Sequence, residues 1–417
     1  MATAPFTPIV PSAMSELRSA PAIVSSPEFQ LLSVCCGQFS KGERAERVRG
    51  ILVRPLDWER LVQLATDHGV VPHVNRALSG SAVAPANGLF LVQQRYEANA
   101  RQTLWLTREL LRVLHHLESH GIDALPYKGP VLAEILYGNV ALRQFSDLDV
   151  LIHPADVTRT KAALLELGYK LSLELTPREE CAYRNSGYEY AFDSSVGQNL
   201  LEMQWQILPR FYSVGFDVDG FFDRATRVSL GGHSVPTLCA EDLMLVLCVH
   251  AAKHAWMQLS WLCDISVLAQ SVDWIAVQER AQRLGIERIV AVTLVLANRL
   301  LGTPLPQPLL PQVQRDPAAE DLAKKILPII TQETEFDTES MAYFRLMMDL
   351  REHWQDRFRL LSRLSFTPSV GEWTAIRLPG PLFPLYGIVR LARLTARLVS
   401  SKRQIQDLGS NSNVGRS

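Results

Sequence analysis

The stretch from Tyr127 to Ile152, YKGPVLAEILYGNVALRQFSDLDVLI, constrains the fold of this 417-residue chain more than any other. Pro130 is a favoured first residue of a helix, and the apolar residues after it share one helical face up to Gly138, which predicts a helix between these positions. Further on, leucine, valine and isoleucine alternate with Asp147 and Asp149, which predicts a strand. Because every second side chain of a strand points the same way, the two carboxylates share one face.

Asp147 and Asp149 would place two like charges about 7 Å apart along this strand. Such a pair is unfavourable unless a cation or water lies against both groups. Magnesium prefers hard oxygen ligands, and proteins usually hold it with one or two carboxylates together with substrate phosphates. The pair is therefore a candidate site for one or two Mg²⁺ ions. The alternative is that both side chains lie on the solvated face of an edge strand.

Lys128 and Gly129 lie between that helix and a short apolar run, residues 122–127. The run predicts a short strand, and Pro126 near its end indicates an edge position in a sheet or a strand that stops there. The N–H groups at the start of a helix, with a lysine beside them, can hold the phosphates of a triphosphate. A tight turn with an exposed lysine is the alternative.

A Lys-Gly turn, a helix that ends in Leu-Tyr-Gly, an arginine and a D-x-D strand follow one another here. This order resembles the signature of the uncharacterised bacterial nucleotidyltransferase families of the polymerase-β-like superfamily. The resemblance extends from about Trp58 to past Asp264 and includes a later acid with a nearby tryptophan and a histidine pair. Its landmarks in this sequence are Lys128, Gly129, Arg143, Asp147, Asp149, Glu202, Trp205, His250 and His254.

The resemblance implies an enzyme that moves a nucleoside monophosphate from a nucleoside triphosphate such as ATP to a hydroxyl of an acceptor, with magnesium as the cofactor. It implies that Asp147, Asp149 and Glu202 bind metal and carry catalysis, with Glu202 assisting a second metal or accepting the proton of the hydroxyl. The expected nucleotide-binding residues are Lys128, Gly129, Arg143, His250, Lys253 and His254. The acceptor is open: a small molecule, a peptide or a protein.

Glu202 lies in a predicted strand, residues 200–207, in which Gln204 and Gln206 share its face. If this strand lies beside the D-x-D strand, Glu202 becomes a third carboxylate of the site. The alternative is an exposed glutamate on a half-buried strand.

His250 and His254 are spaced i, i+4 on a predicted helix, with Lys253 adjacent and Asp264 on the next helix. Two histidines at this spacing can ligate zinc, but the glutamate of an H-E-x-x-H motif is replaced by alanine. We expect instead a polar cluster that lines the nucleotide cleft or joins the two helices.

The expected fold class is α+β, a small mixed-sheet nucleotidyltransferase core inserted between an N-terminal helical layer and a C-terminal all-helical domain. A hydrophobic content of 47% can supply a large core. The expected parts are a flexible tail over 1–27, a helical region over 28–120, the α/β core over 121–238, a helical domain over 239–345 and a basic helical tail over 346–417.

A net charge of −1 does not favour nucleic-acid binding by the whole surface. The N-terminus lacks the pattern of a secretory signal, and no uncharged apolar run reaches the ~18 residues that a membrane span needs. Six cysteines without a C-x-x-C pair suit reduced thiols. We therefore expect a cytoplasmic protein without a transmembrane segment.

From Arg351 to Ser417, eleven Lys and Arg residues stand against four Asp and Glu. The segment IVRLARLTARLVSSKR predicts a basic amphipathic helix, which can contact an anionic membrane surface, nucleic acid or an acidic partner. The favoured interpretation is a terminal helix whose apolar stripe packs on the body while its arginines stay in water.

Two other functions are compatible with the motifs. A lysine near a glycine turn and two metal-binding carboxylates also suit a kinase that transfers the γ-phosphate. A non-catalytic nucleotide-binding adaptor could use the same fold, because a fold does not determine activity.

Overall fold

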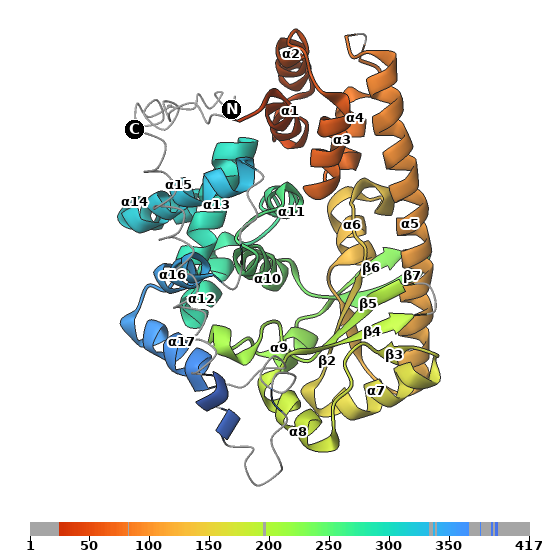
Figure 1. Cartoon of the computed structure of the whole chain (residues 1–417), viewed down its shortest axis with the longest axis vertical. Coiled ribbons are helices and arrows are strands. Elements are labelled where there is room, and N and C mark those ends of the chain that lie inside the picture. The colour runs from red at the N-terminus through yellow and green to blue at the C-terminus, as the bar shows by residue number, and fades with distance from the viewer. Residues whose placement is uncertain are drawn as a thin grey trace, which may run out of the picture.

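The computed structural model describes residues 25–81, 83–194, 197–332, 337, 340–366, 376, 385–386 and 388–390. A mixed sheet lies between the long helix α5 on one side and the C-terminal helices on the other (Figure 1). The predicted α+β class is confirmed. The predicted tail falls outside the described residues up to residue 24, and the predicted basic helix falls outside them from residue 391 onward.

The N-terminal layer is helical, as its periodicity predicts. Ser26, Ser40 and Asp57 each accept a hydrogen bond from the backbone N–H three residues later, which satisfies a group that the start of a helix leaves unpaired. The long α5 runs beside the sheet (Figure 1). The helices are α1 (Pro27–Cys36), α2 (Lys41–Leu52), α3 (Trp58–Asp67), α4 (Val71–Leu78) and α5 (Ala86–Ser119).

The central sheet has the strand order β1-β2-β5-β4-β3. Strands β2 and β5 are parallel, and the other neighbouring pairs are antiparallel. The edge position predicted for β1 from Pro126 is confirmed. The strands are β1 (Ala124–Pro126), β2 (Leu148–Ile152), β3 (Lys170–Leu171), β4 (Glu189–Ser194) and β5 (Gly197–Gln204).

The two faces of the sheet differ in polarity because its strands alternate apolar and polar side chains. Val150, Leu201 and Met203 face a buried apolar cluster that includes Leu110 of α5 and Leu164 of α7. The sheet is thereby held against these two helices, and its acidic residues are left on the opposite face.

Helices connect β1 to β2, β2 to β3 and β3 to β4. The predicted helix of the D-x-D stretch is α6 (Gly129–Tyr137), and Gly138 ends it with φ +63°. After β2 the chain forms a 3₁₀ turn, η3 (Pro154–Asp156), and continues as α7 (Val157–Glu166). Other connecting elements are η2 (Val140–Leu142), α8 (Pro177–Ser186), η4 (Arg210–Tyr212), α9 (Val218–Asp223) and a hairpin of β6 (Thr226–Leu230) and β7 (His233–Thr237).

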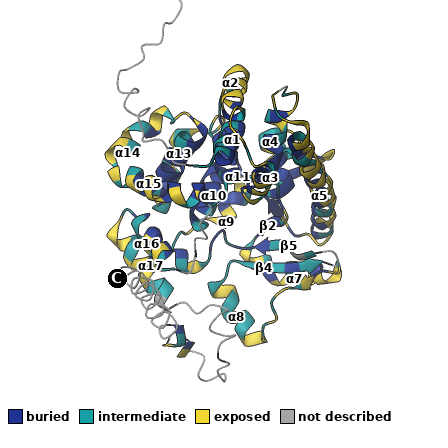
Figure 2. Ribbon diagram, turned by 45° about the horizontal axis from the view of Figure 1, so that its top comes forward, coloured by how far each residue is buried: buried dark blue, intermediate teal, exposed yellow. Residues whose placement is uncertain are grey.

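All described elements after Ala240 are helices, as predicted. Figure 2 shows α10 and α11 as mostly buried, which fits a helix that is apolar on nearly every side. No helix in the described part of the chain is both long and apolar enough to cross a membrane. The elements are α10 (Ala240–Lys253), α11 (Leu259–Leu268), α12 (Trp274–Leu284), α13 (Glu287–Leu301), η5 (Gln307–Leu309), α14 (Leu310–Arg315), α15 (Pro317–Thr331), α16 (Met341–Asp349) and α17 (Trp354–Phe366).

Candidate functional site

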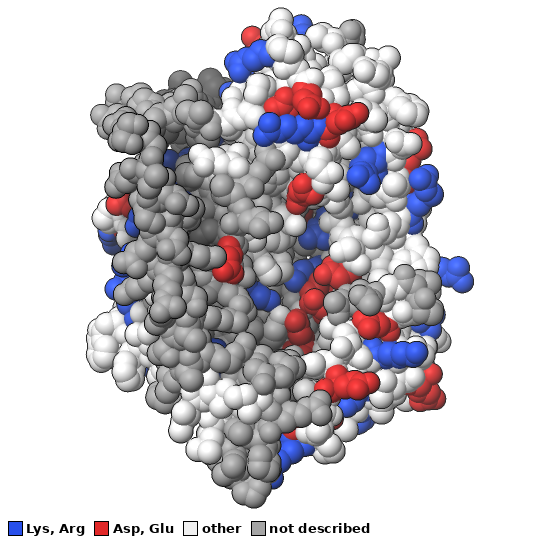
Figure 3. Space-filling model, in the orientation of Figure 1, with Lys and Arg blue, Asp and Glu red and all other residues white. Residues whose placement is uncertain are grey.

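A cleft of about 550 Å³ lies between the polar face of the sheet and helices α10 and α11. Figure 3 shows acidic and basic side chains next to one another in the hollow between the sheet and the C-terminal helices. The structure brings every candidate site residue of the sequence analysis to the wall of this cleft. They are Lys128, Gly129, Arg143, Asp147, Asp149, Glu202, His250, Lys253 and His254.

Three carboxylates converge on one side of the cleft. Asp149 of β2 stands opposite Glu202 of β5 in the parallel register, so both side chains point to the same face. Asp147 precedes Asp149 by two residues and lines the same cleft. Burial, and then the charge of Asp149, raise the pKa of Asp147 and bring that of Glu202 to about 9. These raised pKa values reflect crowded negative charge that a divalent cation would relieve, and a set of carboxylate oxygens fits magnesium.

A fourth acid, Glu189, was not identified in the sequence analysis. Glu189 lies on β4, opposite Gln204 of β5. Its charge is among the causes that raise the pKa of Glu202. Nothing in the local sequence marks it, because its place depends on the antiparallel pairing of β4 with β5. Its position extends the acidic face of the sheet beyond the three carboxylates that line the cleft.

Gln204 connects these acids through its side-chain amide. Its Nε2 lies 3.2 Å from Asp149 Oδ1, 3.0 Å from Glu202 Oε2 and 3.3 Å from Glu189 Oε2. The buried Tyr127 hydroxyl donates to Gln204 Oε1, which fixes the orientation of the amide. Gln204 thus holds Asp149 and Glu202 of the cleft, and Glu189 beside them, in place.

Lys128 lies against the acids. Its Nζ donates to Asp149 Oδ1 at 2.8 Å, and both side chains are mostly buried. Burial alone would lower the pKa of Lys128, but Asp149, Tyr127 and Glu202 together outweigh burial and the pKa is raised. The lysine therefore stays positively charged beside the carboxylates.

Gly129, the first residue of α6, has φ +54°, which an L side chain rarely adopts. A Cβ at this position would lie 3.4 Å from the carbonyl oxygen of Asp147. Glycine therefore lets the start of α6 approach the D-x-D strand closely.

Arg143 is anchored to the C-terminal helices. Its Nε donates to Asp264 Oδ2 at 2.9 Å, and the Tyr137 hydroxyl donates to Asp264 Oδ1 at 2.8 Å. Asn99 of α5 donates to the carbonyl oxygen of Arg143, which fixes its backbone. The sequence analysis placed Asp264 near the histidine pair, but its partner in the structure is Arg143.

His250, His254 and Trp261 form an aromatic wall opposite the acids. The two histidine rings lie 4.9 Å apart, and Trp261 lies 5.2 and 5.4 Å from them, all between ring centroids. Burial, and then the charges of nearby lysines, lower the pKa of His250 well below 6.5 and that of His254 to about 3. Both rings are therefore neutral at pH 7. Within the described residues, no third ligand completes a zinc site here.

Lys253 lies beside this wall. Its Nζ donates to the Tyr188 hydroxyl at 2.8 Å, and the Tyr343 hydroxyl donates to the Lys253 carbonyl oxygen at 2.7 Å. Burial lowers the pKa of Lys253, against the opposing charge of Glu189. A second lysine thus faces the acids from the α10 side.

The raised pKa of Glu202 predicts a pH-dependent stability. A proton held more tightly in the folded state stabilises it fully below about pH 4.5, and this contribution is lost as the pH rises toward 9. Glu202→Gln, which cannot ionise, should therefore melt higher than the unchanged protein at pH 8 and close to it at pH 5. Thermal unfolding with a chelator present measures this. An equal difference at both pH values would contradict the assigned environment of Glu202.

Comparisons with known proteins identify a family for this chain. A family model described as "Uncharacterised nucleotidyltransferase" matches residues 54–302, more than half of the chain and the whole set of candidate residues. A solved structure, "an antigenic nucleotidyltransferase-like protein from Paracoccidioides brasiliensis", is similar with 16% identity and a TM-score of 0.30, over 50% of this chain and 92% of that one. No curated protein matches the sequence.

Proposed function

Because this chain belongs to the uncharacterised nucleotidyltransferase family, we propose that it is a magnesium-dependent enzyme that transfers a nucleoside monophosphate from a nucleoside triphosphate to a hydroxyl. Its family and its fold support nucleotidyl transfer in general. The observation that carries the proposal is the convergence of Asp147, Asp149 and Glu202 on one wall of the cleft. The acceptor is a small molecule, a peptide or a protein.

Asp147 and Asp149 would hold the magnesium, and Glu202 would assist a second metal ion or accept the proton of the attacking hydroxyl. When bound, magnesium supplies positive charge to the phosphate oxygens and to the attacking oxygen. Lys128, at 2.8 Å from Asp149, adds a fixed positive charge on the same side of the cleft. The α-phosphate would thus meet cationic groups where negative charge develops during the reaction.

Glu202 is the proposed proton acceptor. Its pKa of about 9 without a cation shows an environment that favours the protonated carboxyl, and a nearby cation would lower the pKa toward neutrality. A carboxylate with a pKa near the working pH suits general base catalysis. The acceptor hydroxyl would give its proton to Glu202 while its oxygen bonds to the α-phosphorus. The bond from that phosphorus to the bridging oxygen then breaks, and pyrophosphate leaves with the electron pair.

The nucleotide would lie between the start of α6 and the aromatic wall. N–H groups at the start of α6, next to Lys128 and Gly129, suit phosphate oxygens. The neutral rings of His250 and His254 suit a base or sugar, which need no charge. Lys253 would contribute a further positive group, and Arg143 would act mainly by holding the cleft together through Asp264.

Labelled nucleotides test this function. The purified chain is incubated with a cell extract and with ATP labelled at either the α- or the γ-phosphate, with magnesium or with EDTA. We expect the α-label in an acceptor, release of pyrophosphate, and loss of both with EDTA. Transfer of the γ-label alone would instead identify a kinase. Nucleotide binding without turnover, unchanged by EDTA, would identify a non-catalytic adaptor.

A further inference from the structure

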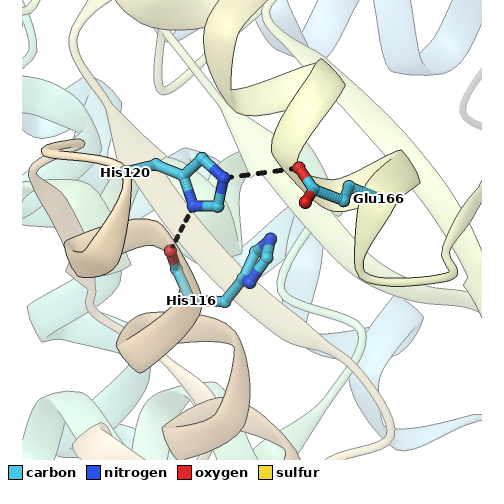
Figure 4. Close-up of side chains that lie close together, drawn as sticks. All are labelled: His116, His120 and Glu166. Carbon is cyan, nitrogen blue, oxygen red and sulfur yellow. Dashed lines mark hydrogen bonds and ion pairs between the residues drawn. The ribbon is translucent and has the colours of Figure 1, made fainter.

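A cluster of two histidines and a glutamate lies away from the cleft, where α5 and α7 end side by side (Figure 4). His116 and His120 come from the end of α5, and Glu166 is the last residue of α7. One ligand atom from each side chain lies within 4.8 Å of the other two. None of the three lines the cleft, and the helices that carry them pack on the apolar face of the sheet.

Hydrogen bonds to backbone carbonyls leave Nδ1 of His116 and Nε2 of His120 for a further partner. His116 Nε2 lies 2.9 Å from the carbonyl oxygen of Ala163, and His120 Nδ1 lies 2.9 Å from that of His116. A ring nitrogen that faces a carbonyl oxygen carries the hydrogen, so in a neutral imidazole the other nitrogen carries the lone pair. Backbone carbonyls orient metal-binding histidines in this way.

The contact between His120 and Glu166 favours a cation between the two side chains. His120 Nε2 lies 3.3 Å from Glu166 Oε2. With the ring hydrogen on Nδ1, a lone pair would face a carboxylate oxygen, and two acceptors at this distance repel each other. A proton or a metal ion between them removes the repulsion.

The position in the fold favours a cation. The C-terminal end of a helix carries partial negative charge, and the ends of α5 and α7 meet at this cluster. A basic residue is nearby, because Arg159 donates to the carbonyl oxygen of His120 at 2.9 Å. Its charge is balanced by Asp156, at 2.6 Å.

We propose that His116, His120 and Glu166 bind a zinc ion that joins the end of α5 to the end of α7. Two histidines and one carboxylate form a donor set that zinc accepts, with water in the fourth position. The exposed Glu166 can move to complete the coordination. The ion would hold together the two helices that support the sheet from its apolar side.

The test is titration of the full chain with zinc chloride, followed by calorimetry. We expect His120→Ala and Glu166→Gln to lose one zinc ion per chain or to bind it at least about tenfold more weakly. His115→Ala is the matched control, because His115 is exposed, next to His116 and outside the cluster, and it should bind like the unchanged protein. Counting ions per chain separates this site from zinc that enters the acidic cleft.

Thermal unfolding gives a second measurement. Zinc should raise the melting temperature of the unchanged protein and of His115→Ala more than that of His120→Ala, because an ion that binds only the folded state stabilises it. Glu166→Gln keeps nearly the same shape at an exposed position, so its folding is not in question. Equal zinc stoichiometry and affinity in all four proteins would overturn the proposal.

Discussion

Replacing Asp149 with asparagine is expected to lower the rate of nucleotidyl transfer by about a thousandfold, the scale of losing a principal charge-stabilising group. Asp149 is only 3% exposed, pairs with Lys128 and stands opposite Glu202. Asparagine has nearly the same shape but lacks the negative charge that a magnesium ion needs. Incorporation of the α-label, measured as an initial rate at saturating magnesium, gives the comparison.

Asp123→Asn is the matched control for Asp149→Asn. Asp123 is an exposed aspartate just before β1, in the same core but outside the cleft. Its replacement should leave the rate unchanged. If Asp149→Asn keeps a rate within a few-fold of the unchanged protein, these carboxylates do not carry the reaction.

Asp264→Ala is expected to destabilise the chain by about 3–5 kcal/mol. The Asp264 carboxylate is 1% exposed and accepts hydrogen bonds from Arg143 and Tyr137. Its removal leaves the guanidinium of Arg143 buried without its charge partner, and the cost of that unpaired charge exceeds the value of the ion pair itself. Unfolding in urea, followed by circular dichroism, measures the free energy of unfolding.

Two further variants separate the cost of the unpaired buried charge from the loss of an ion pair as such. Asp321→Ala removes an exposed acid that pairs with Lys324, and such surface pairs contribute at most about 1 kcal/mol. Replacing both Arg143 and Asp264, with methionine and leucine, removes the two charges together and should recover much of the lost stability. A small effect of Asp264→Ala alone would mean that Arg143 finds another partner or reaches water.

The acidic part of the site was predictable because its residues repeat with the period of a strand. Asp147 and Asp149 alternate with leucine and valine, and Pro130 and Gly138 mark the ends of α6. The sequence predicts the strand that carries Glu202, but it does not show which strands pair. Glu202 could therefore be assigned to the site only on the condition that this strand lies beside the D-x-D strand. The parallel register of β2 with β5 supplies that missing fact and places Glu202 opposite Asp149.

Other parts depend on tertiary contacts. Glu189 and Gln204 reach the site through strand pairing, and the link from Arg143 to Asp264 joins positions 121 residues apart. Neither contact has a local signal. The sequence therefore predicts which residue types the site contains, but not which residues contact one another in the folded chain.

Helix α8 and the β6–β7 hairpin are not predicted from the sequence, for different reasons. Helix α8 has no buried residue, so it lacks apolar periodicity, and its signal is the capping box of Thr176 and Glu179. The β6–β7 hairpin turns at Gly231 and Gly232, both with positive φ, and this Gly-Gly pair is a turn signal that was not used.

The link between Arg143 and Asp264 also bears on how this chain can be dissected. One wall of the cleft belongs to the sheet and the other to α10 and α11. A fragment that stops after β7 would therefore keep the acids but lose the opposite wall and leave a buried arginine unpaired. Buried residues of α1 and α15 also pack in the apolar core of α10 and α11, so the smallest portable unit includes both walls of the cleft and these flanking helices.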